Sequence, residues 1–236
     1  MLGLSVTPLL RWLVVRLAVP ASHISRRSCE GCGVEVSPVG PGWAALLPSG
    51  RCGRCWQRMG APPYLLELCA AVAVTTVLLA APTMPVLLAG LWWAGCAVPL
   101  VFIDAHVHRL PNVITLPAAA GVFALLTVDA AVTDRWEHVL SAAICAAVAT
   151  TVFVSTGLIL GNRGMGLGDA KLILSVTALL GWWGWGAAFG AVFLGFLGAG
   201  LVGVVLLATG RVRRGAHIPM GPFLVAGGFV MLALVA

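Results

Sequence analysis

The chain has 236 residues, of which 60% are hydrophobic and only 9% are charged. A soluble domain carries about 25% charged residues, so this composition excludes a soluble globular enzyme and indicates a polytopic membrane protein. The net charge of +6 would by itself suit a nucleic-acid partner. The arginines fall between apolar segments and not along one face, so we expect no nucleic acid and interpret them as topology signals.

Residues 1–20 are apolar but are interrupted by Arg11 and Arg16, with Pro8 and Pro20 near the ends. A signal peptide would carry positive charge at its start and a small-residue cleavage site at its end, and neither is evident. We interpret this segment as a first membrane helix or as an interfacial amphipathic helix, and the sequence leaves both open.

Residues 21–62 form the one sizeable polar stretch, which we interpret as a small appended domain. The motifs Cys29-x-x-Cys32 and Cys52-x-x-Cys55 are nineteen residues apart. This spacing lies in the range of a zinc ribbon, in which four thiolates complete a closed tetrahedral site. So short a segment builds little core, and a metal would stabilise it. Two disulfides are the alternative, and they require the oxidising side of the membrane.

Residues 63–236 consist of long apolar runs and are expected to form the transmembrane domain. Such runs must satisfy their backbone hydrogen bonds internally in a lipid bilayer. We therefore expect an all-α bundle of about seven or eight transmembrane helices. One run, 170–183, is short for a span and is expected to be tilted, broken or sunk within the bundle. The expected runs cover roughly residues 63–81, 84–103, 113–132, 139–160, 170–183, 186–208 and 218–236.

The loops between the runs agree with the positive-inside rule. With a cytoplasmic cysteine domain, successive crossings place loops 104–112, 161–169 and 209–217 on the same side. The opposite loops contain only Arg135, beside Asp134 and Glu137. Because the cytoplasm is reducing, this topology favours zinc over disulfides. The arginines of the cytoplasmic loops are Arg109, Arg163, Arg211, Arg213 and Arg214.

A glycine-rich turn, residues 164–171 (Gly-Met-Gly-Leu-Gly-Asp-Ala-Lys), leads into the short apolar run. Ionising Asp169 there costs free energy unless something compensates the charge. Gly166 and Gly168 can adopt left-handed backbone angles and allow another chain to approach Asp169 closely. Lys171, the only lysine in the chain, lies two residues on. The alternative is a simple turn in which Asp169 caps the following helix.

A second acid, Asp104, ends the run 84–103 at the boundary where Asp169 begins another run. The intervening chain is long enough for two membrane helices, so the two carboxylates can converge. Two carboxylates about 3 Å apart cannot both ionise readily, so one holds a proton while the other accepts one from a bound water. The water is then the nucleophile, and the protonated acid polarises the scissile carbonyl. The alternative pairs Asp104 with Arg109 and Asp169 with Lys171.

Other polar residues are weaker candidates. Glu67, one turn into the run 63–81, is a candidate supporting group on the cytoplasmic side. His106 and His108 are potential metal ligands, but no further ligands cluster near them in the sequence.

Three motifs in order resemble the type IV prepilin peptidases. The paired cysteine motifs and the stretch 63–68 (Pro-Tyr-Leu-Leu-Glu-Leu) resemble the cytoplasmic domain of the longer, bifunctional members. The resemblance covers the chain from about residue 26 to its end. The three motifs are Asp104 followed by Arg109-Leu110-Pro111-Asn112, the Gly166-Leu167-Gly168-Asp169-Ala170-Lys171 box, and Ile218-Pro219-Met220-Gly221-Pro222-Phe223.

The resemblance implies a multi-pass intramembrane aspartic protease of the GxGD type in the bacterial inner membrane, with its active site facing the cytoplasm. Asp104 and Asp169 match the two catalytic aspartates, and Gly166, Gly168 and Lys171 belong to the active-site loop. The implied substrates are prepilins or pseudopilins of type IV pili and type II secretion, whose basic leader is cut on the cytoplasmic side. Bifunctional relatives also methylate the new N-terminus with S-adenosylmethionine, an activity that the resemblance leaves open.

Two other function classes fit the sequence less well. A transporter would carry acids near mid-membrane on several helices, but the runs are almost free of charge between their ends. A non-catalytic membrane scaffold, whose zinc module binds a partner, is the stronger alternative. It leaves the Gly-x-Gly-Asp turn and the matching depth of Asp104 unexplained. The sequence specifies neither the pilin that is cut nor the oligomeric state.

Overall fold

The computed structural model describes residues 2–19, 25–160, 166–212 and 219–236. Over these ranges the chain forms eight α-helices, two 3₁₀ turns and isolated β-bridges, which confirms the expected all-α class. The α-helices are α1 (Leu2–Leu17), α2 (Leu65–Ala80), α3 (Met84–Val107), α4 (Asn112–Thr133), α5 (Trp136–Leu160), α6 (Leu167–Leu180), α7 (Trp185–Ala208) and α8 (Gly221–Val235), and the 3₁₀ turns are η1 (Trp43–Leu46) and η3 (Gly181–Trp183).

Four of the described helices, α3, α4, α5 and α7, are long and apolar enough to cross a membrane. Helix α6 has 14 residues, which corresponds to about 21 Å at 1.5 Å per residue. The hydrocarbon core is about 30 Å thick, so α6 is too short to span it upright. The 3₁₀ turn η3 follows α6 directly, so the run 170–183 is both short and broken, as its length suggested.

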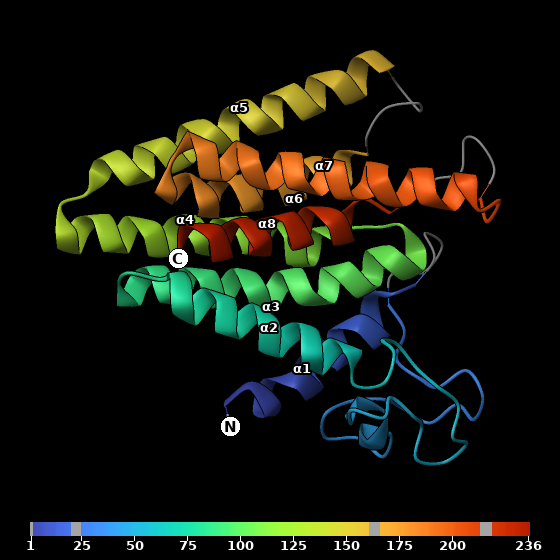
Figure 1. The fold of residues 1–236 in the computed structure, drawn as a ribbon. Helices are drawn as coiled ribbons and strands as arrows, with labels where there is room; N and C mark the ends of the chain where they lie inside the picture. The colour runs from blue at the N-terminus through green and yellow to red at the C-terminus, as the bar shows by residue number, and fades with distance from the viewer. Residues whose placement is uncertain (1, 20–24, 161–165, 213–218) are drawn as a thin grey trace.

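The short helix α6 lies inside the bundle. It packs against α4, α5, α7 and α8, and nearly all of its residues beyond the first turn are buried. Figure 1 shows the long helices side by side, with α5 at one edge of the bundle and α1 and α2 at the other. Burial on several sides removes the need for α6 to match the membrane thickness, because protein and not lipid surrounds it.

The bundle has two distinct ends. We call the end where α2 begins and α3 ends the module end, because the cysteine-containing segment lies there (Figure 1). Helix α1 packs against α2, α3 and η1, and Val15 of α1 belongs to the same buried cluster as Cys29, Cys52 and Met59. Helix α1 therefore contributes to the core of the cysteine segment as well as contacting the bundle.

Some expected features lie outside the described residues. They are Arg163, Arg213, Arg214 and Ile218, and the boundary between the first twenty residues and the cysteine domain.

Candidate active site and metal site

Asp104 lies in the last turn of α3 and is only 5% exposed. Helix α3 continues past the expected end of the apolar run to Val107. It ends at His108, which has left-handed backbone angles (φ 50°) and donates its backbone N–H to the carbonyl oxygen of Asp104 at 2.8 Å. Asp104 is therefore part of a regular helix, and its side chain is enclosed by the bundle.

The backbone of Gly221 holds the Asp104 side chain. Its N–H donates a hydrogen bond to Asp104 Oδ2 at 2.9 Å. Gly221 is the first residue of α8, where backbone N–H groups lack partners within the helix and the helix dipole favours a negative charge. A Cβ at Gly221 would lie 2.7 Å from Asp104 Oδ2, so this position accepts only glycine unless Asp104 moves.

Asp169 lies in the first turn of α6, and its backbone N–H donates to the carbonyl oxygen of Gly166 at 3.0 Å. The N-cap of α6 is Gly166, and Asp169 lies at the third helical position, where its carboxyl group interacts with the backbone of Gly166. Asp169 therefore also contributes to the cap of α6. The carboxyl group is half-buried and lies close enough to Asp104 for the two to interact electrostatically. Helices α3, α6 and α8, which carry Asp104, Asp169 and Gly221, all pack against one another.

The basic residues expected to neutralise the two acids, Arg109 and Lys171, form no ion pair with them in the described part of the chain. Lys171 Nζ donates to Asn112 Oδ1 at 2.6 Å. Lys171 instead connects α6 to the first residue of α4.

Gly166 and Gly168 do not have left-handed backbone angles. Gly166 is extended (φ −65°, ψ 146°), a conformation open to other residues, and Gly168 lies within α6. A Cβ at Gly168 would lie 3.3 Å from Cβ of Leu110. The loop between α3 and α4 therefore approaches α6 closely at Gly168.

The remaining candidates lie apart from this pair. Within the described residues, His106 and His108 do not join any group of three or more potential metal ligands. Asp129 is buried and pairs with Arg135 at 3.3 Å. It is 17 residues beyond Asn112 on α4, about 26 Å toward the opposite end of the bundle.

Glu67 has a structural partner. Its carboxylate accepts hydrogen bonds from Arg11, which lies on α1 and is 1% exposed. The sequence marks Arg11 and Glu67 separately as charges within apolar segments, and each such charge requires a partner. It does not show that they are partners of each other.

The two cysteine motifs form matching turns. Cys29 donates its backbone N–H to Val34, and Cys52 donates to Gln57, each across a short antiparallel bridge. The first turn ends at Gly33 (φ 69°) and the second at Trp56 (φ 60°). Each motif therefore presents two thiols on a tight hairpin-like turn.

The four thiols converge on one point. The Sγ atoms of Cys29, Cys32, Cys52 and Cys55 all lie within 4.8 Å of one another, and two of the distances are 3.5 and 3.6 Å. A Zn–S bond of about 2.3 Å corresponds to S–S distances of about 3.8 Å in a tetrahedron. Backbone N–H groups of Cys55 and Arg54 lower the pKa of Cys52 to about 6, which favours the thiolate that a metal requires. The group could therefore hold a metal ion.

Comparisons with known proteins agree with these features. Residues 88–208, which include Asp104 and Asp169, match the type IV leader peptidase family. A protein of Burkholderia pseudomallei (strain 1026b) called prepilin leader peptidase/N-methyltransferase is 33% identical over 91% of this chain and 70% of its own length. Proteins of the same name from Pseudomonas putida (32% identical, 97% of this chain, 76% of the relative) and Aeromonas salmonicida (29%, 89%, 71%) are also similar.

No solved structure is significantly similar to this chain. The family match covers half of the chain, and the relatives extend the similarity over the cysteine segment. Together with four helices able to span a membrane, they imply a multi-pass protein of the bacterial inner membrane. The chain is a peptidase and belongs to the type IV leader peptidase family.

Proposed function

We propose that this chain is an intramembrane aspartic endopeptidase that removes the basic leader of type IV prepilins or pseudopilins. Asp104 and Asp169 are the catalytic pair in this proposal. The observation that carries it is that α3, α6 and α8 pack together and bring the two acids close enough to interact, although 65 positions separate them in the chain. Neither acid forms an ion pair with a basic side chain of the described residues.

The surroundings of the two acids suggest separate roles. The N–H of Gly221 and the start of α8 stabilise a negative charge on Asp104, which suits the general base that takes a proton from water. The water oxygen then attacks the scissile carbonyl while protonated Asp169 donates to the carbonyl oxygen. When the intermediate collapses, the proton held by Asp104 passes to the leaving amine and the C–N bond breaks. Asp169 takes back a proton from one of the two hydroxyl groups as the carboxyl product forms.

The proposed orientation places the module end in the cytoplasm. Arg109 and Arg211 lie at this end, whereas Arg135 lies at the opposite end, where Asp129 neutralises it. Basic residues gather on the cytoplasmic side of membrane proteins. A basic leader would remain on that side beside Asp104 and Asp169, with its hydrophobic segment in the bilayer.

We also propose three parts for the chain: residues 1–20 as a membrane or interfacial helix, 21–62 as a cytoplasmic module and 63–236 as the peptidase domain. The four cysteines would hold zinc in a closed site that stabilises the module. Gly166 and Lys171 would shape the active-site loop, and the absence of a side chain at Gly168 would allow Leu110 to pack closely against α6.

N-methylation of the new N-terminus is a second candidate activity, favoured by the name shared by the similar relatives. A pocket between α1 and the cysteine module, lined by Trp12 and Glu35 among others, has a volume of about 160 Å³. Pockets that enclose a drug-sized ligand measure about 300–1,000 Å³. This pocket does not fit S-adenosylmethionine, so we derive no methyl-transfer step from it.

Co-expression with a candidate prepilin tests the proposal. The wild type should remove the leader, detected by mass spectrometry, and Asp104→Asn and Asp169→Asn should each abolish removal. Asp134→Asn is the matched control, because Asp134 is an exposed acid at the opposite end and has left-handed angles that Asn also adopts. Cleavage by either active-site variant would refute the assigned pair. Failure of the wild type with several prepilins would favour the scaffold function. A methylated product would establish the second activity.

A further inference from the structure

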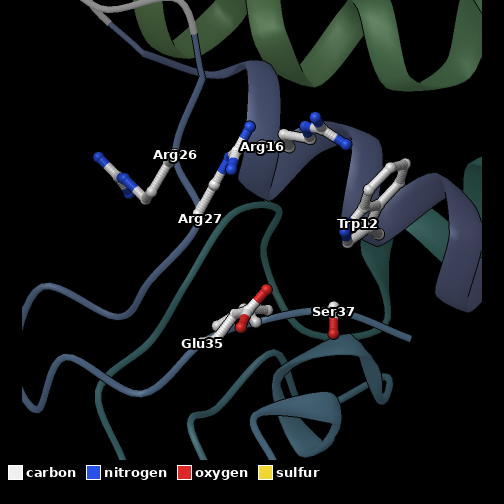
Figure 2. A pocket seen from close by; sticks show the side chains of 7 residues that line it. Trp12, Arg16, Arg26, Arg27, Glu35 and Ser37 are labelled. Atoms are coloured by element: carbon white, nitrogen blue, oxygen red, sulfur yellow. The ribbon is translucent and has the colours of Figure 1, made fainter. Parts of the chain in front are cut away.

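A pocket of about 160 Å³ lies between α1 and the segment that follows it. Neither the acid pair nor the four thiols use it. Figure 2 shows Trp12 and Arg16 projecting from α1, Arg26 and Arg27 on the following segment, and Glu35 and Ser37 on a second segment facing them. The lining residues are Trp12, Arg16, Arg26, Arg27, Glu35, Val36 and Ser37.

Backbone hydrogen bonds fix the walls of this pocket. The N–H of Arg26 donates to the carbonyl oxygen of Arg16 at 2.8 Å, which ties the segment to the end of α1. The N–H of Val36 donates to the carbonyl oxygen of Arg27 at 2.9 Å, which ties the second segment to the first. These backbone hydrogen bonds therefore fix where the main chain of the three arginines lies around the pocket.

The pocket carries an excess of positive charge. The Arg16 guanidinium lies over the Trp12 ring at 4.8 Å, and Arg26 pairs with Glu30 at 2.5 Å. Among the described residues, no carboxylate forms an ion pair with Arg16 or Arg27. Arg16 and Arg27 thus line the pocket without a carboxylate partner, Arg26 pairs with Glu30, and Glu35 is the one lining carboxylate. Guanidinium groups bind phosphate through paired hydrogen bonds. The volume suits one phosphate group better than a whole cofactor.

In the orientation proposed above, with the first turn of α2 at the membrane surface, the pocket would lie at the level of the lipid head groups. Arg11 pairs with Glu67 in the first turn of α2, at the edge of the bundle. Arg16 lies five residues farther along α1 and therefore about 7.5 Å beyond Arg11. Each head-group layer of a bilayer is about 5–8 Å thick. Trp12 is also of the residue type enriched at this interface, and Leu9, one turn before it on α1, exposes an apolar side chain.

We propose that this pocket binds the phosphate head group of an anionic phospholipid, with the acyl chains lying along the exposed apolar side of α1. Basic pockets beside membrane helices on the cytoplasmic side recognise anionic lipids in this way. The bound lipid would anchor α1 and the cysteine module to the membrane surface. This inference rests on the cytoplasmic orientation proposed above, and it does not depend on the catalytic roles of Asp104 and Asp169.

The chain in detergent is titrated with phosphatidylglycerol or phosphatidylcholine to test the proposal. Native mass spectrometry measures the affinity for each lipid. Phosphatidylglycerol should bind more tightly, and Arg16→Gln and Arg27→Gln should each weaken its binding about fivefold. Arg54→Gln is the matched control, because Arg54 is an exposed arginine of the same module outside the pocket. Glu35→Gln should strengthen binding, because it removes the one lining carboxylate.

Equal affinity for the two lipids, or an equal loss in the Arg54→Gln variant, would overturn the proposal. A separate arm adds inorganic phosphate. If phosphate displaces phosphatidylglycerol at equal concentration, the site binds free anions and the lipid assignment is wrong. Thermal unfolding of each variant identifies any that fail to fold. Arg27 is exposed, so Arg27→Gln provides the decisive result if Arg16→Gln unfolds.

Discussion

Arg11 and Glu67 form a two-pronged ion pair that joins α1 to α2. Nε of Arg11 lies 2.6 Å from Oε1 of Glu67, and Nη2 lies 2.8 Å from Oε2. The same guanidinium donates to the carbonyl oxygens of Pro48, Ala61 and Pro62 at 3.0–3.1 Å. One buried side chain therefore fixes α1, the cysteine module and the first turn of α2 relative to one another.

Removing one member of this pair should destabilise the protein strongly. Glu67→Leu leaves the buried charge of Arg11 without a counter-charge, and we expect a loss of about 3–5 kcal/mol in the free energy of unfolding. The double variant Arg11→Met/Glu67→Leu should lose less than Glu67→Leu alone, because it buries no unpaired charge. Denaturant unfolding of the purified protein in detergent measures both.

Glu30→Gln is the control for the comparison of the single and double variants. Glu30 pairs with Arg26 but is exposed, so its loss should cost about 1 kcal/mol or less. Equal losses for Glu30→Gln and Glu67→Leu would show that the Arg11–Glu67 pair has no special role in stability.

Gly221→Ala should lower leader cleavage about 100-fold by displacing Asp104, since misplacing a catalytic group by about 1 Å can cost this much. The new Cβ would lie 2.7 Å from Asp104 Oδ2. Gly200→Ala is the control, because Gly200 lies in helix α7 and a Cβ there meets no atom within 4 Å. The value of kcat/KM for a prepilin peptide, measured with both variants, checks the prediction. Full activity of Gly221→Ala would mean that Asp104 is not held in its reactive position by α8.

The hydrogen bond between Lys171 and Asn112 should act as a unit. If it serves to position the active-site loop, Lys171→Met and Asn112→Ala should each reduce cleavage by a similar factor, and the double variant should be no worse than either. The kcat/KM values of the three variants give this comparison. Independent, multiplying losses would instead indicate that Lys171 contacts the substrate directly.

The cysteine module should bind about one zinc ion per chain. Cys52→Ser should lose the metal, whereas Cys69→Ser, a cysteine on α2 outside the cluster, should retain it. Elemental analysis of the purified proteins measures the metal content. Because protons compete with zinc for the four thiolates, affinity should fall as the pH falls. A wild type that folds fully after treatment with a chelator would rule out a structural metal.

Hydropathy and spacing already indicated much of this protein. The long apolar runs predicted helices α2 to α8, because backbone in lipid must bond to itself. The spacing of the two Cys-x-x-Cys motifs predicted a four-thiol cluster, and the structure brings those thiols together. Asp104 and Asp169 are candidate catalytic residues because ionised acids at the ends of apolar runs cost free energy. Their catalytic role remains a prediction.

Only the tertiary structure shows which groups form hydrogen bonds and ion pairs with Asp104 and Arg11. Gly221 and Asp104 are 117 positions apart, and Arg11 and Glu67 are 56 apart, so no local pattern connects them. The contact at Gly221 is made by a backbone N–H, which every residue except proline carries, so the motif at residues 218–223 did not identify Gly221 as the partner of Asp104. The sequence determined which segments are helical and where charge is costly, whereas helix packing determined which distant groups compensate each charge.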